Sequence, residues 1–311
     1  MPPSFGDVTG EYLALRESAG LVSGAHDLIH VRGPDSASFL QGLVSQDVEG
    51  MEIGEVAHSF LLQPQGKLEA LLWLGRTVGG FVAFTDAGHG ERITALLNRY
   101  RIRVDVSVDF DGHSVVEIWG PDTSAVLAEA GLPDPEGVAH DGDVVVLRAQ
   151  LGPIDRVLLS GVDPDGIPAR SVGDVAATAV RVEAGEPVMG QDVDDKTIPQ
   201  ETGLVARSVS FTKGCFVGQE LVARIDTRGH VNRRLMGVVI GTNVIPPSGA
   251  ELFDGDRKVG VLTSPAESLE LRAPIGLALV RREVADGGAV AVRWEGGEAP
   301  AIVTTLPLDE S

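Results

Sequence analysis

A strand, a Gly-Pro-Asp turn and a helix follow one another twice in the first half of the chain. The first copy has a β-rich stretch at Asp27–Arg32 and turn residues 33–36, Gly-Pro-Asp-Ser. The second has the stretch Val115–Trp119 and turn residues 120–123, Gly-Pro-Asp-Thr. A short helical pattern follows each turn, and proline with Asp or Ser at this point is a helix start signal. We interpret the two copies as an internal repeat.

The turn itself has two interpretations. It is either a loop that cradles phosphate or a plain connection between strand and helix. The second is favoured, because the turn lacks the glycine density of a phosphate loop.

Further strands and helices surround the repeat. Val56–Leu62 and Leu68–Leu74 are joined by the turn signal Gln63–Gly66 and predict a hairpin. Other strands are expected at residues 81–85, 104–110, 144–149 and 156–160, and helices at 11–18 and 91–100. Strands and helices that alternate in this way, with hairpins among them, indicate an α+β fold with layers of the split βαβ kind.

The pattern changes at Arg233. From there the chain has short β-type runs, punctuated by Asp-Gly turns, and shows no helical period. The runs lie at residues 235–241, 250–253, 257–263, 276–280 and 289–294. This is typical of a small all-β barrel or sandwich. We therefore predict two domains, residues 1–232 and 233–311.

Composition excludes several classes of protein. The 45 acidic and 25 basic residues give a formal charge of −20, which disfavours binding to nucleic acid or to anionic membranes. No run approaches the roughly eighteen apolar residues of a membrane span, and the N-terminal residues lack the pattern of a signal peptide. We expect a soluble, cytoplasmic protein. With one cysteine, Cys215, the chain cannot form an internal disulfide.

That cysteine lies in the octapeptide Lys213–Glu220, KGCFVGQE. A helix is expected to begin at Gln219, so Cys215 lies just before a helix N-terminus, with Lys213 two residues away. Both positive charges favour a thiolate. A thiolate there can act as a nucleophile, a redox sensor or a ligand to a metal brought by a partner. The alternative is a buried cysteine in a glycine loop, which the polar flanks disfavour. On the helix, Glu220 and Arg224 have the spacing of an ion pair.

Other polar groups are weaker candidates. The acidic run Asp192, Asp194 and Asp195, together with Glu183 and Glu186, is interpreted as a solvated face, a cation site being the alternative. The histidines show no metal-ligand spacing, and no metal site is predicted. The three tryptophans are interpreted as core residues.

The octapeptide resembles the signature of the YgfZ family, approximately K-G-C-[FY]-x-G-Q-E. The segment Arg181–Gly185, RVEAG, is similar to the R-x-E-A-G segment of the related glycine-cleavage T-protein superfamily, and Pro199–Glu201 is similar to its P-x-E element. Residues 33–48 resemble its N-terminal segment. The chain is thus identified as a YgfZ-like relative of the T-proteins.

This resemblance implies a T-protein-like arrangement of ferredoxin-like subdomains around a central folate cavity, with a C-terminal β-barrel. The cofactor would be tetrahydrofolate or a substituted tetrahydrofolate. Glu183 aligns with the glutamate that binds the pterin, and its alternative is an exposed residue at a strand end. Arg207 lies near a folate-contacting arginine, and its alternative is a solvated loop residue. Gln219 and Arg224 are assigned to ordering the loop at the same site.

The resemblance also implies a function. The protein would bind folate and support iron–sulfur cluster assembly or repair, with Cys215 as the reactive group, Lys213 tuning it, and iron–sulfur enzymes or cluster-assembly proteins as partners. The alternative is a folate-dependent aminomethyl or one-carbon transferase, and a third possibility is a fold that has lost its ligand. T-proteins carry a Gly-Gly-x-x-Asp-Asp segment, whereas Gln65–Ala70 reads QGKLEA and keeps only Glu69 as an acid. Standard aminomethyltransferase activity is therefore not expected, and whether the chain is an enzyme stays open.

Overall fold

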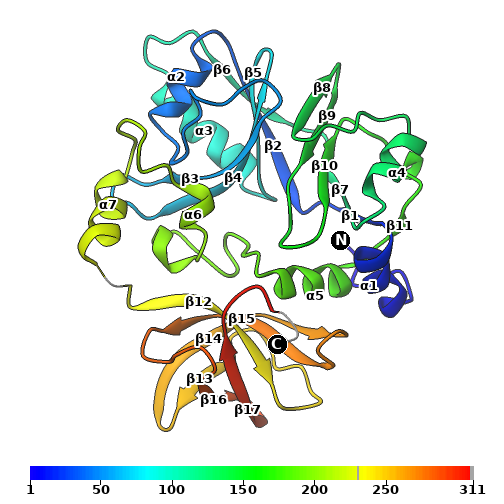
Figure 1. The fold of residues 1–311 in the computed structure, drawn as a ribbon, viewed down its shortest axis with the longest axis vertical. Coiled ribbons are helices and arrows are strands. Elements are labelled where there is room, and N and C mark those ends of the chain that lie inside the picture. The colour runs from blue at the N-terminus through cyan, green and yellow to red at the C-terminus, as the bar shows by residue number, and fades with distance from the viewer. Residues whose placement is uncertain (230, 309–311) are drawn as a thin grey trace.

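The computed structural model describes residues 1–229 and 231–308 and consists of an antiparallel five-stranded sheet, a mixed six-stranded sheet and a closed barrel. Figure 1 shows the two sheets side by side, with the barrel below them and helix α5 (Asp174–Ala184) between. The α+β class and the C-terminal β-barrel predicted from the sequence are confirmed. No helix in the described part of the chain is long and apolar enough to cross a membrane. The cytoplasmic location stays a prediction.

The first sheet has the strand order β3-β4-β5-β2-β6. Its strands are β2 (His26–Arg32), β3 (Val56–Leu62), β4 (Leu68–Thr77), β5 (Gly80–Asp86) and β6 (Ser107–Asp111). Helices α2 (Ser36–Gln41) and α3 (Gly90–Tyr100) pack on one face, where strand alternation points Leu72, Leu74 and Ala83 into a buried core. The opposite face of this sheet contacts the second sheet.

The second sheet has the order β11-β1-β7-β10-β9-β8. Its strands are β1 (Gly20–Ser23), β7 (Val116–Trp119), β8 (Val138–Asp141), β9 (Val144–Arg148), β10 (Arg156–Ser160) and β11 (Arg170–Ser171). Helix α4 (Thr123–Glu129) packs on it. Valine and leucine residues of its central strands are buried on both faces, because α4 covers one face and the first sheet meets part of the other.

The internal repeat predicted from the sequence is confirmed and extends to topology. After the repeated turn and helix, each copy has three antiparallel strands, the last of which pairs with the first strand of the copy, giving β3-β4-β5-β2 and β8-β9-β10-β7. Gly33 and Gly120 both have φ +126°, and a Cβ atom at either would lie 2.3 Å from a backbone carbonyl oxygen. The turn is thus a close-packed connection, as the favoured interpretation holds.

Helix α5 was not expected from the sequence, which suggested a strand end near Glu183. It packs with α1 (Val8–Glu17) between the second sheet and the barrel, and the small residues Ala176 and Ala179 allow this close approach. The other helices are α6 (Val205–Ser208), α7 (Gln219–Arg228) and the 3₁₀ turns η1 (Pro164–Gly166) and η2 (Pro199–Glu201).

The barrel closes in the order β12-β15-β14-β13-β16-β17. Its strands are β12 (Arg233–Ile240), β13 (Glu251–Asp254), β14 (Arg257–Ser268), β15 (Ala273–Arg281), β16 (Ala289–Trp294) and β17 (Gly297–Thr304). Closure comes from pairing of β12 with β17, the first and last strands. We retain residues 1–232 and 233–311 as proposed domains.

Candidate functional site

A cavity of about 260 Å³ lies where the two sheets meet α5 and the loop that follows it. Strand alternation aims Leu71 and Trp73 of β4, and Phe84 and Asp86 of β5, away from the helix-covered core and into this space. The rest of the lining comes from residues 22–26, His58, Trp119, Arg156, Asp174, Ala177, Thr178, Arg181, Glu186, Pro187, Val188, Gln191 and Met1. The cavity therefore combines aromatic walls with buried charged groups.

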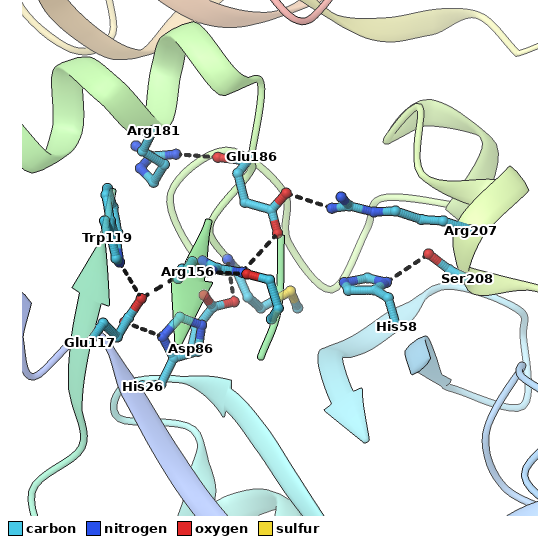
Figure 2. Close-up of polar contacts among 12 residues, drawn as sticks. His26, His58, Asp86, Glu117, Trp119, Arg156, Arg181, Glu186, Arg207 and Ser208 are labelled. Carbon is cyan, nitrogen blue, oxygen red and sulfur yellow. Dashed lines mark hydrogen bonds and ion pairs between the residues drawn. The ribbon is translucent and has the colours of Figure 1, made fainter. Parts of the chain in front are cut away.

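Glu117 organises the wall formed by the second sheet (Figure 2). Its side chain is fully buried, and its carboxylate lies 2.7 Å from Nδ1 of His26 and accepts a 2.8 Å hydrogen bond from Nε1 of Trp119. Nη1 of Arg156 lies 3.8 Å away. Burial raises the pKa of Glu117, but His26 and Arg156 outweigh it and hold the pKa below its usual value. In turn, burial lowers the pKa of His26, and Glu117 more than reverses this.

Asp86 is a buried carboxyl group at the end of β5. It accepts a 2.9 Å hydrogen bond from the backbone N–H of Met189. Burial raises its pKa above the usual value, although His26 acts in the opposite direction. A carboxyl group in a cavity whose pKa is raised by burial is a candidate for proton exchange with a ligand.

Glu186 faces Asp86 from the loop after α5. Its carboxylate lies 2.5 Å from Nη2 of Arg207 and 3.8 Å from Nη2 of Arg156, and its backbone carbonyl accepts a hydrogen bond from Arg181 (Figure 2). Burial raises its pKa, but Arg207 and Arg156 lower it further, so Glu186 is a carboxylate at neutral pH. The sequence predicted a solvated acidic face here, which is wrong, because Asp192 is buried and Glu186 is only 12% exposed, each paired with an arginine.

His58 forms the edge of the cavity nearest α6. Its Nδ1 lies 2.7 Å from Oγ of Ser208, and its ring lies edge-on to Trp73 at 4.9 Å. Burial lowers the pKa of His58 to about 3, and Arg207 adds to this shift. The imidazole is therefore neutral at physiological pH.

Of the residues assigned to folate from the sequence, the structure places Arg207 directly behind the lining residues Glu186 and Trp73 and directs Glu183 elsewhere. Arg207 pairs with Glu186 and lies over the ring of Trp73 at 5.5 Å. The Glu183 carboxylate accepts hydrogen bonds of 2.8 and 2.9 Å from the hydroxyl of Tyr12, with Arg16 at 3.4 Å. Glu183 is buried and is not part of the cavity lining. The carboxylate that faces the cavity is Glu186, three residues later.

Lys213 anchors the octapeptide. Its Nζ donates to the backbone carbonyls of Gln41, Val44 and Gln46 at 2.8, 2.7 and 2.8 Å, which uses all three N–H groups. Burial lowers the pKa of Lys213 to about 8, while nearby Asp47 acts in the opposite direction. The lysine thus joins this loop to the loop that follows α2.

The rest of the octapeptide also packs outside the cavity. Gly218 has φ +81°, and a Cβ atom there would lie 2.6 Å from the carbonyl oxygen of Gln63 in the β3–β4 turn. The Gln219 side chain accepts a hydrogen bond from the N–H of Phe216 within the same loop. Cys215 and Arg224 are exposed, and neither lines the cavity. The ion pairs found among the described residues do not include Glu220 with Arg224.

Sequence reasoning missed most of the cavity residues. Glu117, Arg156 and Asp86 lie in or at the end of strands that are otherwise apolar, namely VEIW, RVLLS and GFVAFTD. A charged residue within an apolar strand is rarely buried without a partner, and this is the local signal that could have found them. Within the described residues, no group of three or more His, Cys, Asp and Glu side chains is arranged to hold a metal ion.

Comparison with known proteins relates this chain to a family. A model described as the GCVT N-terminal domain matches residues 1–134, and one described as the glycine cleavage T-protein C-terminal barrel domain matches residues 233–309. The chain is 28% identical to an aminomethyltransferase of Alkaliphilus oremlandii, over 92% of the chain and 84% of the relative. It is 27% identical to one of Nostoc sp., over 100% and 90%.

A solved structure of a relative has the same fold as this chain. Glycine cleavage system aminomethyltransferase T from Bartonella henselae is 25% identical, with a TM-score of 0.89, over 100% of this chain and 92% of that one. The T-protein-like arrangement predicted from the sequence is confirmed.

These comparisons correct the main functional expectation. Support of iron–sulfur cluster assembly or repair was inferred from the octapeptide, but the relatives that match almost the whole chain are named aminomethyltransferase. The comparisons likewise give no support for iron–sulfur enzymes or cluster-assembly proteins as partners. Both ends of the chain match T-protein domains and the whole chain superposes on a T-protein structure, so it belongs to the glycine-cleavage T-protein-like superfamily.

Proposed function

We propose that this protein binds a tetrahydrofolate in the cavity between the sheets and transfers an aminomethyl or other one-carbon group with it. The observation that carries the proposal is the convergence of Asp86, Glu186 and Arg156 in a cavity walled by Trp73 and Trp119. The family relationship supports the same conclusion, since the relatives are named for aminomethyl transfer.

The donor and acceptor groups of the cavity suit a pterin. Its flat ring system offers apolar faces to tryptophan, and its amino-pyrimidinone edge offers N–H donors and one carbonyl oxygen. The Glu186 carboxylate can accept those N–H groups. At about 260 Å³ the cavity is slightly below the roughly 300 to 1,000 Å³ usual for drug-sized ligands, so it suits the ring system rather than a whole folate.

The bound tetrahydrofolate supplies nitrogen atoms that accept a one-carbon unit. The chain's own residues orient it, exclude water and exchange a proton. Asp86 is our candidate for that proton exchange, since burial raises its pKa. Glu69 belongs to the segment that aligns with the T-protein aspartates, but it is held by Arg92 and does not line the cavity.

The test uses tetrahydrofolate and an aminomethyl donor. Binding is followed by quenching of tryptophan fluorescence, and turnover by formation of methylene-tetrahydrofolate. We expect Asp86→Asn to abolish turnover, Glu186→Gln to weaken binding by about tenfold or more, and Glu69→Ala to leave both unchanged. Binding without turnover by the wild type would reject the transferase and leave a folate-binding protein. Absence of binding would reject the proposal.

Within the superfamily, we propose a YgfZ-like branch for this chain. The support is the octapeptide Lys213–Glu220 together with the changed segment Gln65–Ala70, and the two contact each other, since Gly218 packs on the turn that contains Gly66. In the proposed function, this contact holds the octapeptide loop against the first sheet. Cys215 takes no part in the proposed transfer reaction.

A further inference from the structure

Arg156 is a buried arginine whose hydrogen-bonding capacity is only partly used. Its side chain is 3% exposed, and its guanidinium lies over the ring of Trp73 at 5.7 Å. Nε donates to the backbone carbonyl of Ala149 at 3.2 Å. This bond and the tryptophan fix where the guanidinium lies in the cavity wall.

The outer nitrogens of Arg156 have weaker partners. Nη1 is 3.8 Å from Glu117 and Nη2 is 3.8 Å from Glu186, which are ion-pair separations too long for hydrogen bonds. Nη2 is buried and has no hydrogen-bond partner among residues 1–229 and 231–308. A buried donor on a charged group is rarely left unpaired, because it has lost its water without gaining an acceptor. An acceptor from a ligand would complete this site.

We propose that Nη2 of Arg156 donates a hydrogen bond to the ring carbonyl oxygen of the bound pteridine and so makes the cavity selective for 4-oxo over 4-amino pteridines. The inference rests on the proposed function. The Glu186 carboxylate accepts N–H groups and Arg156, 3.8 Å away, supplies the donor, so together the two side chains match the pattern of an amino-pyrimidinone edge. An amino group in place of the carbonyl would present N–H to N–H, with no acceptor for Arg156.

The preference for 4-oxo pteridines depends on a guanidinium group at position 156. Lysine has no planar fork and cannot combine the Nε bond to Ala149 with a second, diverging donor. Methionine matches the apolar stem and removes every donor. The two substitutions therefore separate the charge of residue 156 from its hydrogen-bonding geometry.

The experiment compares folic acid with its 4-amino analogue aminopterin, by calorimetry or by quenching of Trp73 and Trp119 fluorescence. The wild type should bind folic acid at least about tenfold more tightly. Arg156→Met should bring the two affinities to within about twofold, and Arg156→Lys should restore only part of the preference. Arg148→Gln is the matched control, since it removes a guanidinium from the neighbouring strand β9, outside the cavity lining. It should keep the wild-type ratio.

The outcomes are distinguishable. Equal binding of both compounds by the wild type would overturn the role of Arg156 while leaving the folate site intact, and this comparison needs no variant to fold. An unchanged ratio in a folded Arg156→Met protein, with a circular dichroism spectrum like that of the wild type, would also overturn it. If neither compound binds, this inference fails, and the proposed function fails with it only if tetrahydrofolate does not bind either.

Discussion

At the scale of single residues, the cavity holds more charge than a buried space usually tolerates. Burying a charge is strongly unfavourable unless an opposite charge or hydrogen bond compensates for it. Here Glu117 compensates for His26 and Arg156, and Glu186 compensates for Arg207. The partners come from separate elements, so the ionic network also fixes how the two sheets and the loop after α5 lie together.

Removing one member of this network should be strongly destabilising. Glu117→Ala leaves His26 and Arg156 buried without their carboxylate, and we expect a loss of about 3 to 5 kcal/mol in the free energy of unfolding by urea. The control is Glu251→Ala, which removes an exposed ion pair with Lys258 and should change stability by less than about 1 kcal/mol. Equal effects of the two substitutions would contradict the compensating role of Glu117.

His58 should make stability depend on pH. The pKa of the folded side chain is about 3, against 6.5 in an unfolded chain. Between these values the unfolded chain binds a proton that the folded protein does not, so stability falls as the pH falls below 6.5. From pH 7 to pH 5, wild type should lose about 1 to 2 kcal/mol more than His58→Gln, measured by urea unfolding at each pH. Identical pH profiles would show that His58 is not the group responsible.

At the scale of elements, the octapeptide is a docking loop. Lys213 holds the loop after α2, Gly218 packs on the β3–β4 turn, and Gln219 closes the loop on itself. Polar residues around a cysteine suggested a reactive site from sequence alone. In the structure, Lys213, Gly218 and Gln219 have packing roles, whereas Cys215 is exposed.

The docking role predicts a contrast between two neighbouring positions. Lys213→Met removes the donor shared by three carbonyls and should lower the free energy of unfolding by about 1 to 3 kcal/mol. Cys215→Ser changes an exposed side chain and should lie within about 0.5 kcal/mol of wild type. Urea denaturation measures both. A stable Lys213→Met protein would show that the loop is held by its other contacts.

Most elements were predictable from local pattern, and the exceptions have physical reasons. The strand Val56–Leu62, the strand Ala289–Trp294 and the helix Gln219–Arg228 match the structure, since alternation and helical period are local properties. Helix α5 was missed although its alanines favour a helix, because its apolar residues do not lie on a single face: Val175 is exposed, whereas Ala177 and Val180 are buried. Strand β17 was missed because Gly297 and Pro300 interrupt its β pattern.

At the scale of the whole molecule, the barrel supports the cavity without lining it. Asp192 lies just beyond the Glu186 loop and accepts hydrogen bonds of 2.5 and 2.6 Å from Thr263 and Ser264 of β14. A β-bulge at this point lets two consecutive residues reach the same carboxylate. Arg181 and the N–H of Val188 bind its other oxygen.

This junction predicts an effect of the barrel on ligand binding. In the double variant Thr263→Val, Ser264→Ala, Asp192 loses both barrel donors and the loop that carries Glu186 loses its support. Provided the cavity binds folate, affinity should fall roughly tenfold by fluorescence titration. Thr242→Val, a barrel substitution away from this junction, should bind as wild type does. An unchanged affinity in the double variant would mean that the loop holds its position by itself.

The cavity could be predicted from the sequence only in part. The T-protein resemblance predicted a central folate cavity and brought attention to Arg207, which contacts its carboxylate Glu186. The convergence of Asp86, Glu117 and Arg156 could not be predicted, because these residues lie on strands of two sheets whose packing is a long-range property. The register of α5 decides that Glu183 faces Tyr12, and sequence alignment does not give that orientation.

The repeated unit has a consequence for how such a cavity can change. The two copies share a topology but not their side chains, and His30 of one stands at the same place before the turn as Glu117 of the other. A pocket between two halves of the same topology is bounded by side chains that each half supplies from its own strands. Substitutions on one half can therefore alter what is recognised while the opposite half keeps its form, which gives descendants of one ancestral scaffold room to acquire different chemistries.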